Sequence, residues 1–196
     1  MPFNYFTYGV ACAEVELDVL TGDMTCVRAD VLVDLGRSLN PALDIGQIEG
    51  AFAQGVGLFT MEELVWGNKK KHKWVRDGQF LTLGPGAYKI PSSNDVPLDF
   101  RVSLLKKSCN PFAVHSSKAV GEPPLFMGSS VAFAARQAVQ AARKDAGCSA
   151  AFFPLDSPLT PERLRMACAD DITRFFAGGE GADLDEAASF RPAGCW

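Results

Sequence analysis

Apolar and polar residues alternate near the start of the chain, as they do in a β-strand that buries one face. Glu14 and Glu16 occupy one parity, and the other parity is uniformly apolar: Ala11, Ala13, Val15 and Leu17. Residues 20–23 have a turn composition, and residues 24–34 resume an alternating run that is rich in β-branched side chains. We therefore predict a β-hairpin that serves as scaffold, with a further strand later in the chain over 100–105.

Helical spacing replaces this alternation after a break at 39–42. From 44 to 64, apolar side chains recur three or four residues apart, which predicts a helix: Ile48, Phe52, Val56 and Phe59. Each glycine inside a helix costs roughly 1 kcal/mol relative to alanine. Four glycines interrupt this one: Gly46, Gly50, Gly55 and Gly57. We infer that another backbone or a bulky ligand comes very close to this helix.

Two more helices are predicted in the second half of the chain. Residues 123–146 carry a face of small apolar residues behind a proline doublet, and Gly147 follows as a helix stop. Residues 161–177 follow Thr160, which suits an N-cap, and precede Gly178. No clear linker divides the chain, so we expect one unit over 1–178 and a loosely ordered tail over 179–196.

Composition and charge exclude several classes of protein. Hydrophobic residues make up 47% and charged residues 21% of the 196 residues, as in ordinary globular proteins. A net charge of −4 supplies no basic field for nucleic acid. No apolar run approaches the roughly 18 to 20 residues of a membrane span. With no targeting signal visible, we expect a cytoplasmic protein without nucleic-acid or membrane partners.

The six cysteines are scattered through the chain and form no C-x-x-C pair. This spacing fits neither a zinc ribbon nor an iron–sulfur cluster. We therefore expect buried, reduced thiols. Since the chain has only two histidines, we also expect it to supply no metal ligands.

Glu122 is the strongest candidate for chemistry. It lies between apolar flanks, with Gly121 before it and the Pro123-Pro124 doublet after it. A following proline favours extended backbone, so we expect the glutamate to be fixed at the entrance of a helix. Burial and a helix N-terminus would act on its ionisation in opposite senses, which makes it a candidate general base. A plain N-terminal cap on the helix is the alternative.

Two further features could meet a ligand. Gln47 lies near the start of the glycine-rich helix, where its amide offers a donor and an acceptor, although an ordinary surface glutamine is the alternative. The lysine-rich residues 69–73 could meet a phosphate, but a solvated loop is the commoner explanation for such a run.

Motifs in the chain resemble, in order, the xanthine dehydrogenase and aldehyde oxidase family. The segments are FTYGVA (6–11), SLNPA (38–42), DIGQIEGAF (44–52), YKIP (88–91) and SKAVGEPP (117–124). They resemble the C-terminal end of these molybdenum hydroxylases, within the second molybdopterin-binding region, and the resemblance covers residues 3–177.

The resemblance implies an α+β fold of mixed sheets with packed helices, as part of a molybdopterin-binding domain. It implies that Glu122 is the general base, which takes a proton from a hydroxyl group on molybdenum. It also implies that Gln47 contacts the molybdopterin, and that Lys118, Ala119 and Gly121 line the pocket near the metal. The implied reaction is oxidative hydroxylation of a purine, such as hypoxanthine or xanthine, or of an aldehyde.

The resemblance also implies what the chain lacks. The family's iron–sulfur, FAD and first molybdopterin domains lie upstream, so we expect a fragment or subunit that is inactive alone. It would share its cofactor with the upstream domains or a partner subunit, and a second copy of the chain is a further candidate partner. The alternative is a non-catalytic remnant that serves as a binding or dimer-contact module.

Overall fold

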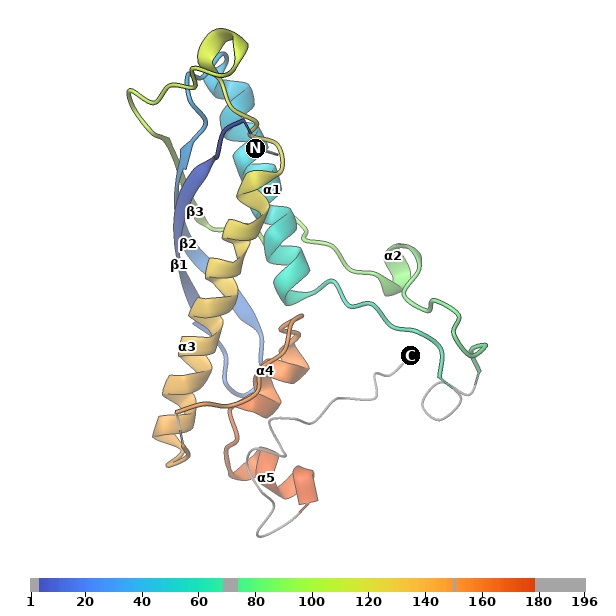
Figure 1. Ribbon diagram of the computed structural model, residues 1–196. Helices are drawn as coiled ribbons and strands as arrows, with labels where there is room; N and C mark the ends of the chain where they lie inside the picture. The colour runs from blue at the N-terminus through green and yellow to red at the C-terminus, as the bar shows by residue number, and fades with distance from the viewer. Residues whose placement is uncertain (1–3, 69–73, 150, 179–196) are drawn as a thin grey trace. The chain divides into compact units, whose positions relative to one another are not determined.

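The computed structural model describes residues 4–68, 74–149 and 151–178 (Figure 1). The helices and strands are β1 (Tyr8–Leu17), β2 (Met24–Asp34), α1 (Pro41–Thr60), α2 (Gly84–Ala87), β3 (Asp99–Leu104), the 3-10 helices η1 (Val114–Ser116) and η2 (Pro123–Gly128), α3 (Ser129–Asp145), α4 (Pro161–Ala167) and α5 (Asp171–Gly178). In this part of the chain no helix is both long enough and apolar enough to cross a membrane. The predicted tail over 179–196 and the lysine-rich run 69–73 lie outside the described residues.

The chain divides into two compact units. Unit 1 comprises Met1–Val15, Thr25–Val56 and Pro91–Ala134, and unit 2 comprises Glu16–Met24, Gly57–Ile90 and Ala135–Trp196. Every predicted site residue lies in unit 1.

A three-stranded sheet, in the order β1-β2-β3, forms the frame of unit 1. β2 and β3 pair in parallel, with Val31 opposite Val102. The predicted alternation is confirmed: Ala11 and Ala13 of β1 are half-buried, whereas Cys12 is exposed. On β2 the buried positions alternate in the same way, and they are Ala29, Val31 and Val33. The hairpin and the later strand were therefore predicted correctly.

Helix α1 packs its apolar stripe against the sheet. Ile48, Phe52 and Val56 are fully or almost fully buried, and the ring centroids of Phe52 and Phe100 of β3 are 5.0 Å apart. The helix begins before the predicted start at 44, because the Asn40 side chain accepts the Ala42 N–H (3.2 Å) and caps it. It also ends earlier, at Thr60.

The predicted helix over 123–146 is two elements. The 3-10 helix η2 comes first, and α3 begins only at Ser129. The change falls at Gly128, where the backbone approaches α1: a Cβ atom on Gly128 would lie 2.5 Å from the carbonyl carbon of Gly55. The predicted stop is confirmed, since Gly147 has φ +72° and its N–H donates to the Lys144 carbonyl (3.1 Å).

The predicted helix over 161–177, in unit 2, is also two elements, α4 and α5. Thr160 caps α4 as predicted, because its hydroxyl accepts the Arg163 N–H (3.4 Å). The helix breaks at Ala169, which has φ +54°. Asp170 then starts the next helix, because its carboxylate accepts the Thr173 N–H (3.0 Å).

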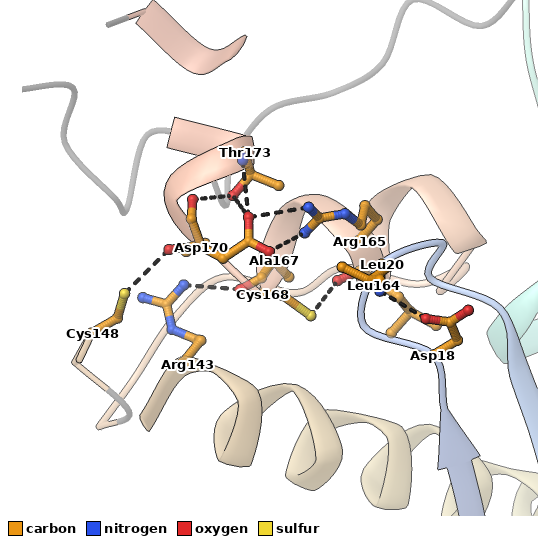
Figure 2. Close-up of polar contacts among 11 residues, drawn as sticks. Asp18, Leu20, Arg143, Cys148, Leu164, Arg165, Ala167, Cys168, Asp170 and Thr173 are labelled. Atoms are coloured by element: carbon orange, nitrogen blue, oxygen red, sulfur yellow. Dashed lines mark hydrogen bonds and ion pairs between the residues drawn. The ribbon is translucent and has the colours of Figure 1, made fainter. Parts of the chain in front are cut away.

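Arg143 ties the end of α3 to α4 in unit 2. Figure 2 shows its guanidinium reaching the α4 backbone, where Nη1 donates to the Ala167 carbonyl (3.0 Å). Nε donates to the Ser149 carbonyl (2.9 Å), and the group lies 4.7 Å from the Phe153 ring centroid. The side chain is fully buried, so it donates to these carbonyls inside the protein rather than at an exposed helix end.

The expectation of buried cysteines is only partly right. Cys26 and Cys168 are buried, and burial raises the pKa of Cys26 to about 11. Cys12 and Cys109 are exposed, because Cys12 falls on the uncovered parity of β1 and Cys109 on a loop. Cys195 lies outside the described residues.

Candidate functional site

Gln47 and Gly121 are neighbours in unit 1, although they are far apart in the sequence. Gln47 is an exposed residue of α1, and Gly121 belongs to the loop that leads into η2. A Cβ atom on Gly121 would lie only 3.1 Å from Oε1 of Gln47. The structure thus brings together the two regions, DIGQIEG and SKAVGEPP, that contain the candidate residues.

Glu122 is exposed directly beside this contact, at the head of η2. Its backbone is helical (φ −104°, ψ −35°) rather than extended, so the conformation expected from the following proline is wrong. The reason is that its carbonyl accepts the Leu125 N–H (3.0 Å), which closes the first turn of η2. Its side chain makes no capping hydrogen bond, which contradicts the alternative role of a plain N-cap.

The segment after Glu122 is fixed by contact with α1. Pro124 is buried, and a Cβ atom on Gly55 would lie 1.9 Å from the Leu125 carbonyl oxygen. A side chain at Gly55 would therefore displace the start of η2. This confirms, at Gly55, the inference that another backbone comes very close to the glycine-rich helix.

Gly46 and Gly50 of α1 differ from Gly55, because they are open. Among the described residues, no atom outside the adjoining backbone of α1 lies within 4 Å of a Cβ atom built on either glycine, and Gln47 is exposed between them. This face of the helix presents bare backbone and one amide that can both donate and accept hydrogen bonds. An open surface with an exposed amide fits a ligand that makes hydrogen bonds.

Metal ligands do not accompany this surface. Among the residues that the structure describes, no group of three or more His, Cys, Asp or Glu side chains could hold a metal ion.

The Lys118 side chain forms an ion pair inside the protein. Its Nζ lies 2.6 Å from Oδ2 of Asp34, and the two side chains are only 8% and 10% exposed. The ammonium also lies 5.6 Å from the ring centroid of Tyr8. The other carboxylate oxygen of Asp34 accepts the Gly36 N–H (3.0 Å) and the Ser108 hydroxyl. Lys118 therefore anchors its segment to the end of β2.

These contacts keep Asp34 charged. Burial alone would raise the pKa of Asp34, but the hydrogen bonds from Lys118, Ser108 and Gly36 outweigh it and lower the pKa below its usual value. The aspartate is thus ionised at neutral pH, and the contact with Lys118 is a buried ion pair.

Backbone contacts hold the same segment. Lys118 N–H donates to the Leu35 carbonyl (2.7 Å), and Ser117 forms an antiparallel bridge with Gly36. Ala119, which is exposed, donates its N–H to the Tyr5 hydroxyl (3.2 Å). The chain enters this segment through His115 and Ser116, whose φ values of +61° and +62° are uncommon for non-glycine residues.

Asp34, Ser108 and Asn110 support the site and were missed in the sequence analysis. Asn110 is buried, and its amide donates to the Ser117 carbonyl (3.0 Å). Only Asp34 could have been recognised from the sequence. It is a charged residue at the end of a buried strand, and such a residue needs a partner from elsewhere in the chain.

Comparison with known proteins decides the family. A family model described as a molybdopterin cofactor-binding domain matches residues 1–97, which include Gln47. Xanthine dehydrogenase of Oryza sativa subsp. japonica is 61% identical over 176 residues, 90% of this chain. The chain belongs to the xanthine dehydrogenase and aldehyde oxidase family. The xanthine dehydrogenase/oxidase of Gallus gallus, 54% identical over 179 residues, covers 91% of the chain.

Solved structures of this family of molybdenum oxidoreductases share the fold. Quinoline 2-oxidoreductase from Pseudomonas putida 86 aligns with 79% of this chain at a TM-score of 0.64 and 26% identity, over 17% of its own chain. An aldehyde oxidoreductase from Desulfovibrio desulfuricans aligns with 84% of this chain and 16% of its own at a TM-score of 0.59 and 25% identity. The expected α+β fold is confirmed.

The match covers only a small part of each family member. The chain spans 13% of the length of the rice relative and 12% of the chicken relative.

Proposed function

We propose that this chain supplies Glu122 as the general base of a molybdenum hydroxylase that oxidatively hydroxylates a purine such as hypoxanthine or xanthine. One observation carries the proposal: Glu122, exposed and with no capping hydrogen bond, stands at the head of η2 directly after Gly121, which lies against Gln47. The similarity to xanthine dehydrogenases favours a purine over an aldehyde as substrate.

The molybdenum-molybdopterin cofactor would lie against α1 and the loop before η2. Gln47 would hold it through its amide, Gly46 and Gly50 would leave it room, and Ala119 and Gly121 would line the pocket. When bound, the cofactor supplies the two-electron oxidation of the substrate.

The role of Glu122 is to hold and move a proton. A general base must be ionised, within hydrogen-bond reach of the proton that it takes, and fixed in position. Glu122 is exposed, while its backbone is fixed by the η2 turn and by the contact of Leu125 with Gly55. Lys118 would contribute to the site by fixing the backbone, since its ammonium is paired with Asp34.

The chain would form one wall of the complete active site. Large apolar side chains on the two elements that follow Glu122, Phe126 of η2 and Phe133 of α3, are exposed, which favours cover by another part of the enzyme. Upstream domains or a partner subunit would supply that cover, together with the substrate-discriminating residues and the iron–sulfur and FAD centres. In that arrangement residues 1–178 form part of a molybdopterin-binding domain and are inactive alone.

A non-catalytic remnant is the second candidate function. The observation that favours it is the exposure of large apolar side chains such as Phe126 and Phe133, which suits a contact surface. Such a remnant would keep the fold as a binding or dimer-contact module, and Glu122 would have no role in it.

Steady-state kinetics of Glu122→Gln separate the two candidates. The variant is made in the hydroxylase assembled with this chain, and Glu14→Gln, an exposed glutamate on β1, is the control. A general base predicts that Glu122→Gln lowers kcat by about 10²- to 10⁴-fold with molybdenum content unchanged, whereas Glu14→Gln has no effect. Hydroxylation retained by Glu122→Gln would contradict the proposal.

A further inference from the structure

We propose that the buried Asp34–Lys118 pair positions the base of the site: it fixes the start of the loop, residues 118–125, that carries Glu122. The proposal rests on the proposed function of Glu122 as the base. Neither residue of the pair would touch the substrate, so both are positioning residues that act through the glutamate.

The loop from Lys118 to Leu125 is fixed at both ends and exposed between them. At its start, Lys118 joins Asp34 through its side chain (2.6 Å) and Leu35 through its N–H (2.7 Å). At its end, the Leu125 carbonyl lies against Gly55, and Pro124 is buried. Ala119, Gly121 and Glu122 lie between these anchors and are exposed. Two anchors that leave the middle open suit a loop that presents a side chain to a ligand.

The first anchor depends on charge more than the second does. Asp34 receives Lys118 at one oxygen, and Gly36 and Ser108 at the other, so each carboxylate oxygen has a donor. If Asp34 lost its charge, the Lys118 ammonium would be left buried without a counterion, and it would have to move toward water. Because the same residue begins the loop, its movement would displace the backbone that leads to Glu122.

A second ion pair of the same length provides a matched control. Nε of Arg28 lies 2.6 Å from Oδ2 of Asp30 on the same strand, β2, but these side chains are 39% and 44% exposed. The pair lies within the strand, so no loop depends on it. Asp30→Asn therefore removes an equivalent contact without releasing the site loop, and exposed pairs of this kind contribute little to stability.

The first test measures the loop itself in the full 196-residue chain. Hydrogen–deuterium exchange of the Lys118 and Ala119 amides is compared in wild type, Asp34→Asn, Lys118→Met and Asp30→Asn. We expect both changes to the buried pair to raise the exchange rate of these amides by about tenfold or more, because the hydrogen bonds of the amides open locally. Asp30→Asn should leave the exchange rates unchanged. Unchanged exchange in Asp34→Asn and Lys118→Met would overturn the proposal.

The second test asks whether the pair acts through Glu122. In the assembled hydroxylase, Asp34→Asn should lower kcat by about 10- to 100-fold with KM nearly unchanged, because the base is misplaced. In a Glu122→Gln background the same change should produce no further loss, and Lys118→Arg should keep much of the wild-type kcat. An equal loss in both backgrounds would show a general structural effect and overturn the proposal.

The outcomes separate this proposal from the function on which it rests. If Glu122→Gln alone retains full activity, the proposed base is wrong, while the exchange measurement still decides whether the pair fixes the loop. If Asp34→Asn does not fold, Ser108→Ala removes one hydrogen bond from the same carboxylate and leaves the pair intact. We then expect a smaller acceleration of hydrogen exchange at the same two amides, and unchanged exchange would overturn the proposal.

Discussion

The side-chain oxygen of Gln47 lies so close to Gly121 that a Cβ atom on the glycine would be 3.1 Å from it. The glycine therefore allows the loop before Glu122 to lie directly against the exposed amide of α1. The contact is made by the far end of a flexible side chain, so an added methyl group would move Gln47 rather than unfold the protein.

Gly121→Ala should accordingly separate cofactor binding from folding. We expect the free energy of unfolding to change by less than about 1 kcal/mol, because the side chain can give way. Molybdenum content of the assembled hydroxylase should fall, because the amide that would hold the cofactor is displaced. Metal analysis and urea unfolding of the same preparations check both parts, and normal molybdenum content would contradict the assigned role of Gln47.

Alanine substitutions at Gly50 and Gly55 should have opposite effects on stability. Gly50 has no neighbour within 4 Å of a built Cβ atom, so alanine should stabilise the chain by roughly 0.5–1 kcal/mol through helix propensity. At Gly55 the added atom would lie 1.9 Å from the Leu125 carbonyl oxygen, and we expect a destabilisation of about 1–3 kcal/mol. Urea unfolding measures both, and equal effects would contradict the described packing of η2 on α1.

Removing the charge of Asp34 should change how stability depends on pH. The folded state lowers the pKa of Asp34 below the usual value of 3.8, so its stabilisation is present above that value and is lost as pH falls through the folded-state pKa. Asp34→Asn should therefore lose about 3–5 kcal/mol at pH 7, and the difference from wild type should shrink in acid. Unfolding free energies between pH 7 and pH 3 check this, and a difference independent of pH would contradict it.

Arg143→Met should destabilise unit 2. It removes the hydrogen bonds to the Ser149 and Ala167 carbonyls, and bonds from charged groups contribute about 1.5–3 kcal/mol each. The neighbouring Lys144 is exposed, so Lys144→Met is a matched control that should stay within about 0.5 kcal/mol of wild type. Thermal unfolding compares them, and equal stability of the two variants would argue against the buried role of Arg143.

The pattern of apolar residues along the chain correctly predicted the strands of unit 1 and the face of α1 that packs on them. Alternation identified the covered parity of β1, and three- and four-residue spacing identified the stripe of α1 that packs on the sheet. The sequence pattern did not predict where the helices break. The break before Ser129 depends on the contact of Gly128 with Gly55, and the break at Ala169 depends on one residue in the left-handed region.

The supporting residues of the site depend on tertiary structure in the same way. Asp34 and Lys118 lie on separate elements, and nothing in the spacing of either residue identifies the other as its partner. The glycines of α1 look equivalent in the sequence, yet Gly55 meets a backbone, whereas Gly46 and Gly50 face open space in the part of the chain that the structure describes. Only the arrangement in space separates the glycine that packs against a backbone from those that stay open.

The central claim is that Glu122 takes a proton during hydroxylation, and a single-turnover measurement tests it most directly. Product formed per cofactor is followed after mixing hypoxanthine with the fully loaded hydroxylase containing this chain, so that electron transfer to an acceptor does not limit the rate. The account predicts that Glu122→Gln slows this turnover by about 10²- to 10⁴-fold while the cofactor stays bound. A turnover rate equal to that of wild type would contradict it.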